Sequence, residues 1–222
     1  VFYDPLFLLV NMTTPTTINN ETELSAVNTI LGAIGQSPIT ELESSQVTAS
    51  YQDPQTGIIH SILKECNSDV QNEGWSFNRE DHVKFTSDPT TKHILIPTNV
   101  LRIDSENPED KSINIIRRHG KLYDKVNHTF EFEDEIFCNV IYFFEYEDIP
   151  SIFKRLITYK AAGRAAAQLV TNSNLVQLLQ IQEQAAKASC LEYECNQGDY
   201  NMLGFPENTN YSTYKPFKGL QR

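Results

Sequence analysis

Apolar residues recur every three or four positions in two segments near the start of the chain. Residues 20–35 carry one such stripe, with Asn20 as the expected N-cap and Gly35 as the stop signal. A second stripe follows Pro54 and ends at Gly74. Its apolar positions are Ile59, Ile62, Leu63, Cys66 and Val70. The pattern predicts two amphipathic helices.

From His82 to Glu147 the helical period gives way to a period of two. Short runs of β-branched and aromatic residues alternate with polar ones and are separated by Asn, Gly and Asp-Pro or Asn-Pro pairs. No helix-sized segment lies between these runs, which argues against a parallel βαβ sheet. The pattern predicts an antiparallel sheet of about four to six strands.

Helical spacing returns after Pro150, which is expected to open a third helix whose later part is rich in alanine. Asn172 or Ser173 is the expected cap of a fourth helix, and Gly198 follows its end. The face expected to be buried on this last helix consists of Leu175, Leu178, Leu179, Gln182, Ala186 and Ser189.

The order of these elements predicts an α+β fold: a four-helix bundle with an inserted antiparallel β domain and an extended C-terminal arm. The expected parts are a flexible N-terminal segment (1–19), two halves of the bundle (20–79 and 149–198), the β domain (80–148) and a docking arm (199–222). Within the first part, a short apolar run precedes Met12 and a polar run follows it. Residues 1–11 are therefore expected to be a non-native extension.

The balance of charge argues against a protein that holds nucleic acid. The 222 residues include 29 acidic and 18 basic ones, which gives a formal net charge of −11. Proteins that neutralise phosphates need clustered Lys and Arg. The one basic cluster spans residues 117–121 and reads as a solvated corner between a strand and a turn.

The motifs of metal and cofactor sites are missing from the sequence. Cys66, Cys138, Cys190 and Cys195 form no C-x-x-C pair, and the five histidines are scattered. Glycine-rich phosphate loops are also missing. We expect buried free thiols in a reducing compartment, and no bound metal or cofactor.

Two groups of residues match patterns that can carry out catalysis or bind a cation. Ser151 and Lys154 match the Ser-x-x-Lys pattern of some serine hydrolases, without its companion motifs. An acidic group of the β segment consists of Glu131, Glu133, Asp134 and Glu135. Paired carboxylates can serve a glycosidase or a cation site, but this group also suits a solvated hairpin end.

The only tryptophan lies in the stretch NEGWSFN, where the helical pattern stops. Gly74 is expected to end the second helix with a left-handed residue. Trp75 and Phe77 are expected on one side of an extended segment, with Ser76 and Asn78 on the other. A ligand platform is the alternative, but the pattern favours a structural corner formed by Gly74, Trp75, Phe77 and Pro150, with a hinge between helices and sheet.

The residues after Gly198 alternate aromatic side chains with Asn, Pro and Gly, and the last twelve contain no acid. Such a segment cannot bury much surface alone and is expected to order against a partner. Its expected contact residues are Tyr200, Met202, Leu203, Phe205, Tyr211, Tyr214, Lys215, Phe217, Lys218 and Arg222.

Four stretches, in this order, resemble a known family. They are ETELSAVNTILGAIGQSPITELE, GWSFN, EYEDIPSIFKRLITYKAAGRAA and CLEYECNQGDYNMLG, within residues 20–204. Together they are similar to tail tubular protein A, the head-to-tail adaptor family of short-tailed phages (podoviruses) of the autographivirus type. The β segment and the C-terminal arm match little beyond the pattern.

The resemblance implies a structural virion protein without catalysis, cofactor or membrane contact, assembled in the host cytoplasm and located at the head-tail interface. It implies a ring of identical copies, expected to be a dodecamer, between the portal protein and the nozzle protein (tail tubular protein B). Tail fibres are a further possible partner. Double-stranded DNA would pass through the ring without specific binding, and acids such as Glu131, Glu133, Asp134 and Glu135 are candidates for the channel lining.

Two other functions remain open at this point. A DNA-binding packaging or assembly factor would need a basic surface, for which only residues 117–121 qualify. A virion-associated hydrolase would use Ser151 with Lys154, or the acidic group.

Overall fold

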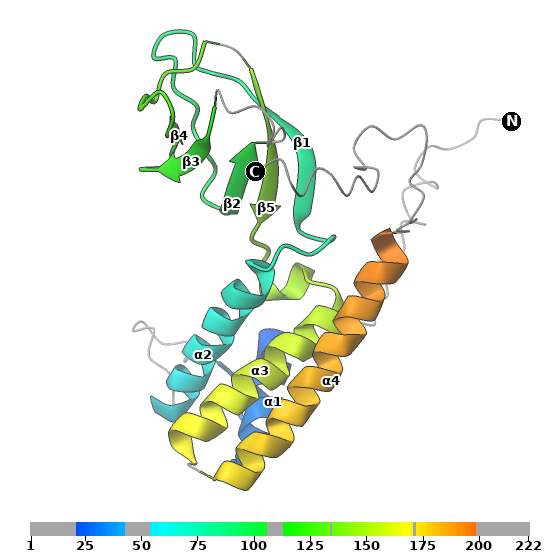
Figure 1. Cartoon of the computed structure of the whole chain (residues 1–222). Helices are drawn as coiled ribbons and strands as arrows, with labels where there is room; N and C mark the ends of the chain where they lie inside the picture. The colour runs from blue at the N-terminus through cyan, green and yellow to red at the C-terminus, as the bar shows by residue number, and fades with distance from the viewer. Residues whose placement is uncertain (1–20, 43–53, 106–112, 134, 171, 199–222) are drawn as a thin grey trace, which may run out of the picture.

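The computed structural model describes residues 21–42, 54–105, 113–133, 135–170 and 172–198. The described part contains four α-helices and five β-strands (Figure 1). The helices gather at one end of the molecule and the strands at the other. This arrangement confirms the predicted α+β class.

Helix α3 (Ser151–Leu169) lies at the centre of the helical part. The helices α1 (Glu23–Ala33), α2 (Pro54–Gln71) and α4 (Ser173–Gly198) all pack on it. The second half of α3 buries Ala161, Ala162, Ala165 and Ala166. These small side chains let the neighbouring helices come close to the α3 backbone.

Helix α1 begins later than the apolar pattern predicts. Asn20, the expected cap, lies outside the described residues, and Thr22 occupies the cap position. Its Oγ1 accepts a hydrogen bond from Ser25 N at 3.3 Å. The predicted apolar stripe of α2 is buried as expected, and His60 Nε2 on α2 lies 3.0 Å from Glu23 Oε2 on α1.

The buried face of α4 differs from the predicted one. Asn172 is its cap, because Asn172 Oδ1 accepts a hydrogen bond from Asn174 N at 3.1 Å. The side chains that the core buries are Leu179, Ala186 and Cys190, with Leu175 and Val176 beside them. The prediction was wrong for Leu178, Gln182 and Ser189, which are exposed, because α3 covers only a narrow strip of α4.

The five strands form two antiparallel sheets rather than the single predicted one. β5 (Ile136–Tyr142) lies between β1 (Arg79–Phe85) and β2 (Val100–Ser105). β3 (Ile115–Arg118) and β4 (Lys121–Asp124) form a separate hairpin. The basic cluster 117–121 turns this hairpin, with φ of +51° at His119 and +72° at Gly120.

Two of the alternating runs between His82 and Glu147, at residues 93–97 and 128–133, were expected to be strands but make only isolated bridges. The backbone enters the left-handed region at Lys92 and at His128, which interrupts an extended run at the start of each segment. The two sheets still share one apolar core. Its buried members are Ile94, Ile96, Val100, Ile103, Ile115, Leu122, Phe132, Ile136, Cys138 and Val140.

The four cysteines form no disulfide bond, but not all of them are buried. Cys66, Cys138 and Cys190 are buried, whereas Cys195 on α4 is exposed and corrects the expectation. Burial raises the pKa of the Cys66 and Cys190 thiols to about 11. Because the thiolate is the reactive form, these two groups are protected by protonation as well as by packing.

We predict that a thiol reagent such as Ellman's reagent modifies one cysteine per folded chain at pH 8, and four after denaturation. Peptide mapping should place the fast site at Cys195, and Cys195→Ser should remove it. Rapid modification of two or more thiols in the folded protein would contradict the burial of Cys66, Cys138 and Cys190.

Candidate functional site: the corner between helices and sheet

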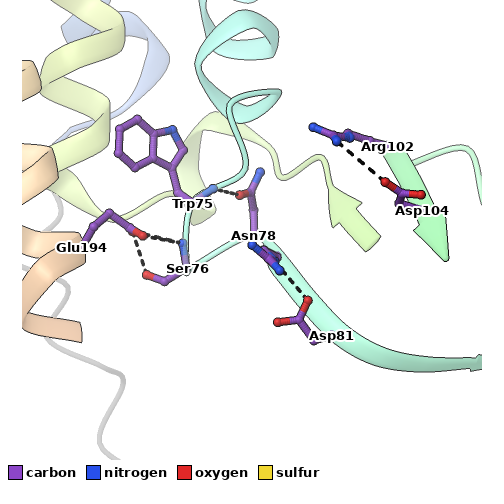
Figure 2. A network of polar contacts seen from close by, with 8 residues as sticks. Trp75, Ser76, Asn78, Asp81, Arg102, Asp104 and Glu194 are labelled. Carbon is purple, nitrogen blue, oxygen red and sulfur yellow. Dashed lines mark hydrogen bonds and ion pairs between the residues drawn. The ribbon is translucent and has the colours of Figure 1, made fainter. Parts of the chain in front are cut away.

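The chain passes twice between the helical part and the three-stranded sheet. Residues 72–78 lead from α2 to β1, and residues 143–150 lead from β5 back to α3. These two crossings form the corner, and Figure 2 shows polar contacts around it. The only tryptophan of the sequence, Trp75, lies in the first crossing.

Gly74 ends α2 in the left-handed conformation, with φ of +79°. Its N–H donates a hydrogen bond to Gln71 O at 3.1 Å. A Cβ atom at this position would lie 2.6 Å from Ile141 Cδ1 on β5. Glycine therefore allows both the turn and the close approach of the central strand.

Trp75 lies inside the helical core rather than on a surface. It is 5% exposed, its ring centroid lies 5.0 Å from that of Phe153, and its Nε1 donates to Val70 O at 2.8 Å. Phe77 also packs on Phe153, at 4.7 Å between centroids. No face of the indole is open to a ligand.

Pro150 occupies the N-cap position of α3, where its carbonyl accepts hydrogen bonds from Phe153 N and Lys154 N. The preceding short 3-10 helix η2 (Tyr146–Asp148) inserts Tyr146 into the core. The Tyr146 hydroxyl lies 3.0 Å from Thr158 Oγ1. Burial raises the pKa of Tyr146 to about 12, so the phenol is neutral in the physiological range.

The buried amide of Asn78 joins the two crossings. Asn78 Oδ1 accepts from Trp75 N at 2.9 Å, which closes the turn of the first crossing. Asn78 Nδ2 donates to Gln71 O at 2.9 Å and to Tyr142 O at 3.0 Å, at the end of β5. One side chain thus satisfies groups from α2, from the turn and from the returning strand.

Gln71 also joins the two crossings, through the backbone of Phe144 in the second crossing. Its Oε1 accepts from Phe144 N at 2.8 Å, and its Nε2 donates to Phe144 O at 2.9 Å. The same Nε2 donates to Asn67 Oδ1 at 2.8 Å. Gln71 is fully buried, so each of these hydrogen bonds satisfies a group that water cannot reach.

The expectation that Ser76 and Asn78 share one side of an extended segment was wrong. Residues 76–78 form a turn, so Asn78 points inward and Ser76 points outward. Glu194 of α4 accepts hydrogen bonds from Ser76 N at 3.0 Å and from Ser76 Oγ at 2.8 Å (Figure 2). The last helix is thereby attached to the first crossing.

A second contact secures α4 at the same place. Lys187 Nζ lies 3.2 Å from Glu73 Oε2. This ion pair is half exposed and contributes little by itself, about 0–1 kcal/mol. Together with the Glu194 contacts, it fixes the side of α4 that faces the corner.

A shallow hollow of about 160 Å³ opens between the corner and the outer face of the sheet. Its charged side chains are paired locally: Arg102 with Asp104 at 3.9 Å, and Arg79 with Asp81 at 3.0 Å (Figure 2). The other lining residues are Glu73, Gly74, Asn139, Val140 and Ile141. The hollow is small and close to neutral, which is unsuited to phosphate binding.

The acidic group lies on the sheet part and carries counter-charges that the sequence did not reveal. Lys92 Nζ lies 2.9 Å from Glu133 Oε1, and Lys84 Nζ lies 2.7 Å from Glu135 Oε1. The hydrogen bond from Lys92 lowers the pKa of Glu133. Glu131 is exposed, and Asp134 lies outside the described residues.

The Ser-x-x-Lys pattern serves the packing of the corner. Lys154 is 1% exposed, and its Nζ donates to Glu147 O at 2.9 Å. This hydrogen bond ties η2 to the first turn of α3. Ser151 is exposed at the start of α3, whereas the buried lysine donates its amine to the Glu147 carbonyl.

The ten expected contact residues of the arm, Tyr200 to Arg222, lie outside the described residues. Within the part that the structure describes, no three His, Cys, Asp or Glu side chains are grouped so as to hold a metal ion. Among the same residues, no helix is long and apolar enough to cross a bilayer.

Comparison with known proteins gives one family. A family model described as tail tubular protein matches residues 24–200, well over half of the 222 residues. The match includes the four helices, the sheets and both crossings. No curated protein matches the chain.

We predict that Asn78→Ala destabilises the protein by about 2–4 kcal/mol, because it leaves Trp75 N unpaired at a buried position and removes the hydrogen bond to the half-buried Tyr142 O. Ser76→Ala, which removes only an exposed hydroxyl, should cost less than about 1 kcal/mol. Urea unfolding followed by circular dichroism measures both values. Equal, small effects would contradict a structural role for the Asn78 amide.

Gly74→Ala should cost more than Gly120→Ala. Both substitutions force alanine into the left-handed region, at about 1–2 kcal/mol each. Only at Gly74 does the added methyl also meet a side chain, Ile141, whereas nothing lies within 4 Å at Gly120. Thermal unfolding of the two variants gives the difference; equal shifts in Tm would show that β5 does not press on the turn.

Proposed function

The chain belongs to the tail tubular protein family, and from this premise we propose that it is the head-to-tail adaptor, tail tubular protein A, of a short-tailed phage. In this role identical copies form a ring between the portal protein and the nozzle protein, which is tail tubular protein B. The four ordered sequence stretches and the family match over residues 24–200 carry the proposal.

The two-part build supports an adaptor. A connector has to offer separate surfaces to the proteins on its two sides, and here a helical core and a strand core lie at opposite ends of the described molecule (Figure 1). We propose that residues 20–79 with 149–198, and residues 80–148, act as these two units. The cross-bonded corner would keep their mutual orientation the same in every copy.

The charge pattern favours an open channel over a protein that retains DNA. The net charge is −11, and many of the basic side chains in the described part are paired with acids. These are Arg79, Lys84, Lys92, Arg102, Arg164 and Lys187. In the basic cluster, Arg117 donates to Val100 O at 2.6 Å and Arg118 covers the Tyr123 ring. A DNA-binding packaging factor is therefore the weaker candidate.

We further propose that Glu131, Glu133, Asp134 and Glu135 face the channel. A negative lining repels phosphates and lets DNA pass without being held. The pairs of Lys84 with Glu135 and of Lys92 with Glu133 would moderate this repulsion, and they weaken as salt rises because all four side chains are half or more exposed.

Electron microscopy of the protein alone and mixed with the portal protein tests the proposal. We expect rings of this chain bound coaxially to the portal, and DNA retention on the ring that is weak at all salt concentrations. Tight, strongly salt-dependent DNA binding by free chains, without portal association, would instead support the packaging factor.

Truncation after Gly198 should leave the helices folded and abolish docking to the portal. The fold should survive because the contacts of α4 with α3 and with the corner all lie before this residue. Circular dichroism and co-sedimentation with portal measure the two effects. A truncated protein that still bound the portal normally would refute the proposed role of the arm and its ten contact residues.

A further inference from the structure

Helix α4 is apolar on the side that faces away from the protein. In a surface helix that packs on one neighbour, the opposite face is normally polar. On α4, however, Leu178 is 61% exposed, Ile181 is 62% exposed and Leu191 is 51% exposed. Ile181 lies opposite the buried residues Leu179 and Cys190, and Leu178 and Leu191 lie on the two flanks of this outward side, so α3 does not cover them.

The spacing of the exposed residues places them in a band along the outward side of the helix. Leu178, Ile181, Ala185 and Ala188 follow one another at intervals of three, four and three. Leu191 and Cys195 continue at intervals of three and four. We call these six residues the outer stripe. The first four residues have the spacing of a helix–helix seam, whereas Leu191 lies toward one flank, and the two alanines permit a close approach.

Most of the outer stripe lacks charge. Between Asn174 and Ala188, the residues that flank it on the outward side are Asn and Gln; the exposed Glu192 lies beside its C-terminal end, one turn from Ala188 and from Cys195. The two charged residues of this stretch lie elsewhere: Glu183 is half-buried, and Lys187 pairs with Glu73. By contrast, the outward side of α2 carries Lys64, Glu65 and Asp69.

Neutrality matters because each copy carries a net charge of −11. Copies that met through acidic surfaces would repel one another, whereas a neutral apolar face can be buried without opposing like charges. Among the faces of α2, α3 and α4, the outer stripe combines long apolar side chains with an outward side that is free of charge from Asn174 to Ala188. A second copy of this chain is the partner that such a face fits best.

We propose that the outer stripe is the contact through which one copy packs on the next in the ring; the inference rests on the proposed ring function. A helix of 26 residues is about 39 Å long and about 10 Å wide, so one face offers roughly 400 Å². This is about half of the roughly 800 Å² per partner in a standard interface.

The stripe is therefore the centre of a larger contact. In a closed ring the contact joins two different surfaces, so the stripe of one copy meets another face of its neighbour. The hydrogen bonds of Glu194 and the ion pair of Lys187 hold α4 against the corner. Every copy thus presents its stripe at the same angle to its sheet, which ring closure requires.

Ile181→Glu and Leu178→Glu test the proposal, with Leu95→Glu as the control. Leu95 is 69% exposed on the sheet part and lies off the stripe. We expect the stripe variants to keep the wild-type Tm but to need at least about tenfold more protein to form rings, alone or on the portal. The control should assemble like wild type. Equal effects of all three substitutions, or normal assembly of the stripe variants, would overturn the proposal.

Cys195 provides an independent measurement without substitution. It is the exposed cysteine among the four of the chain and belongs to the outer stripe. Its rate of maleimide labelling should fall at least about tenfold from free chain to ring, also in rings assembled from chains truncated after Gly198. Unchanged labelling in complete rings would overturn the stripe contact and leave the ring function intact.

Absence of any ring would count against the proposed function instead. If two copies paired through the stripe and stopped at a dimer, the stripe would be upheld and the ring rejected. Protection of Cys195 only when the arm is present would assign the stripe to the arm and overturn its role between copies.

Discussion

Two buried amides, Gln71 and Asn78, bind the outgoing and returning chain where it passes between helices and sheet. Their hydrogen bonds reach Phe144, Tyr142, Trp75 and the end of α2. A buried peptide group without a partner costs about 1–3 kcal/mol, so these two side chains stabilise the crossings where the chain leaves the core. Without them, the crossings would keep the backbone hydrogen bond from Tyr142 N to Asn78 O but lose their side-chain hydrogen bonds.

The corner also fixes what the rest of the molecule can do. Trp75 and Phe77 pack on Phe153 at the centre of the helices, and Gly74 lets β5 approach. On the outside, Glu194 ties α4 to the same turn. Helices, sheet and the exposed face of α4 consequently form one unit, which suits a protein whose proposed task is to repeat the same contacts around a ring.

Sequence periodicity predicted the helices well because each buries a stripe against α3. Periodicity gave wrong predictions where contacts between distant segments determine which side chains are buried and where strands are interrupted. Nothing local shows that α3 covers only a strip of α4, so Leu178 was placed inside, and left-handed residues at Lys92 and His128 interrupt runs that alternate like strands. The Gln71 and Asn78 bridges join residues more than sixty positions apart, for example Asn78 and Tyr142; a single sequence holds no signal for such pairs.

Hydrogen exchange of the corner amides tests most directly whether helices and sheet are one rigid unit. The N–H groups of Tyr142 and Phe144 bond across the corner to Asn78 O and Gln71 Oε1. We expect both to exchange only on global unfolding, as slowly as the amides of Leu156 and Ile157 in the core of α3. Exchange as fast as that of exposed loops, while α3 stays protected, would show that the corner opens as a hinge and would contradict this account.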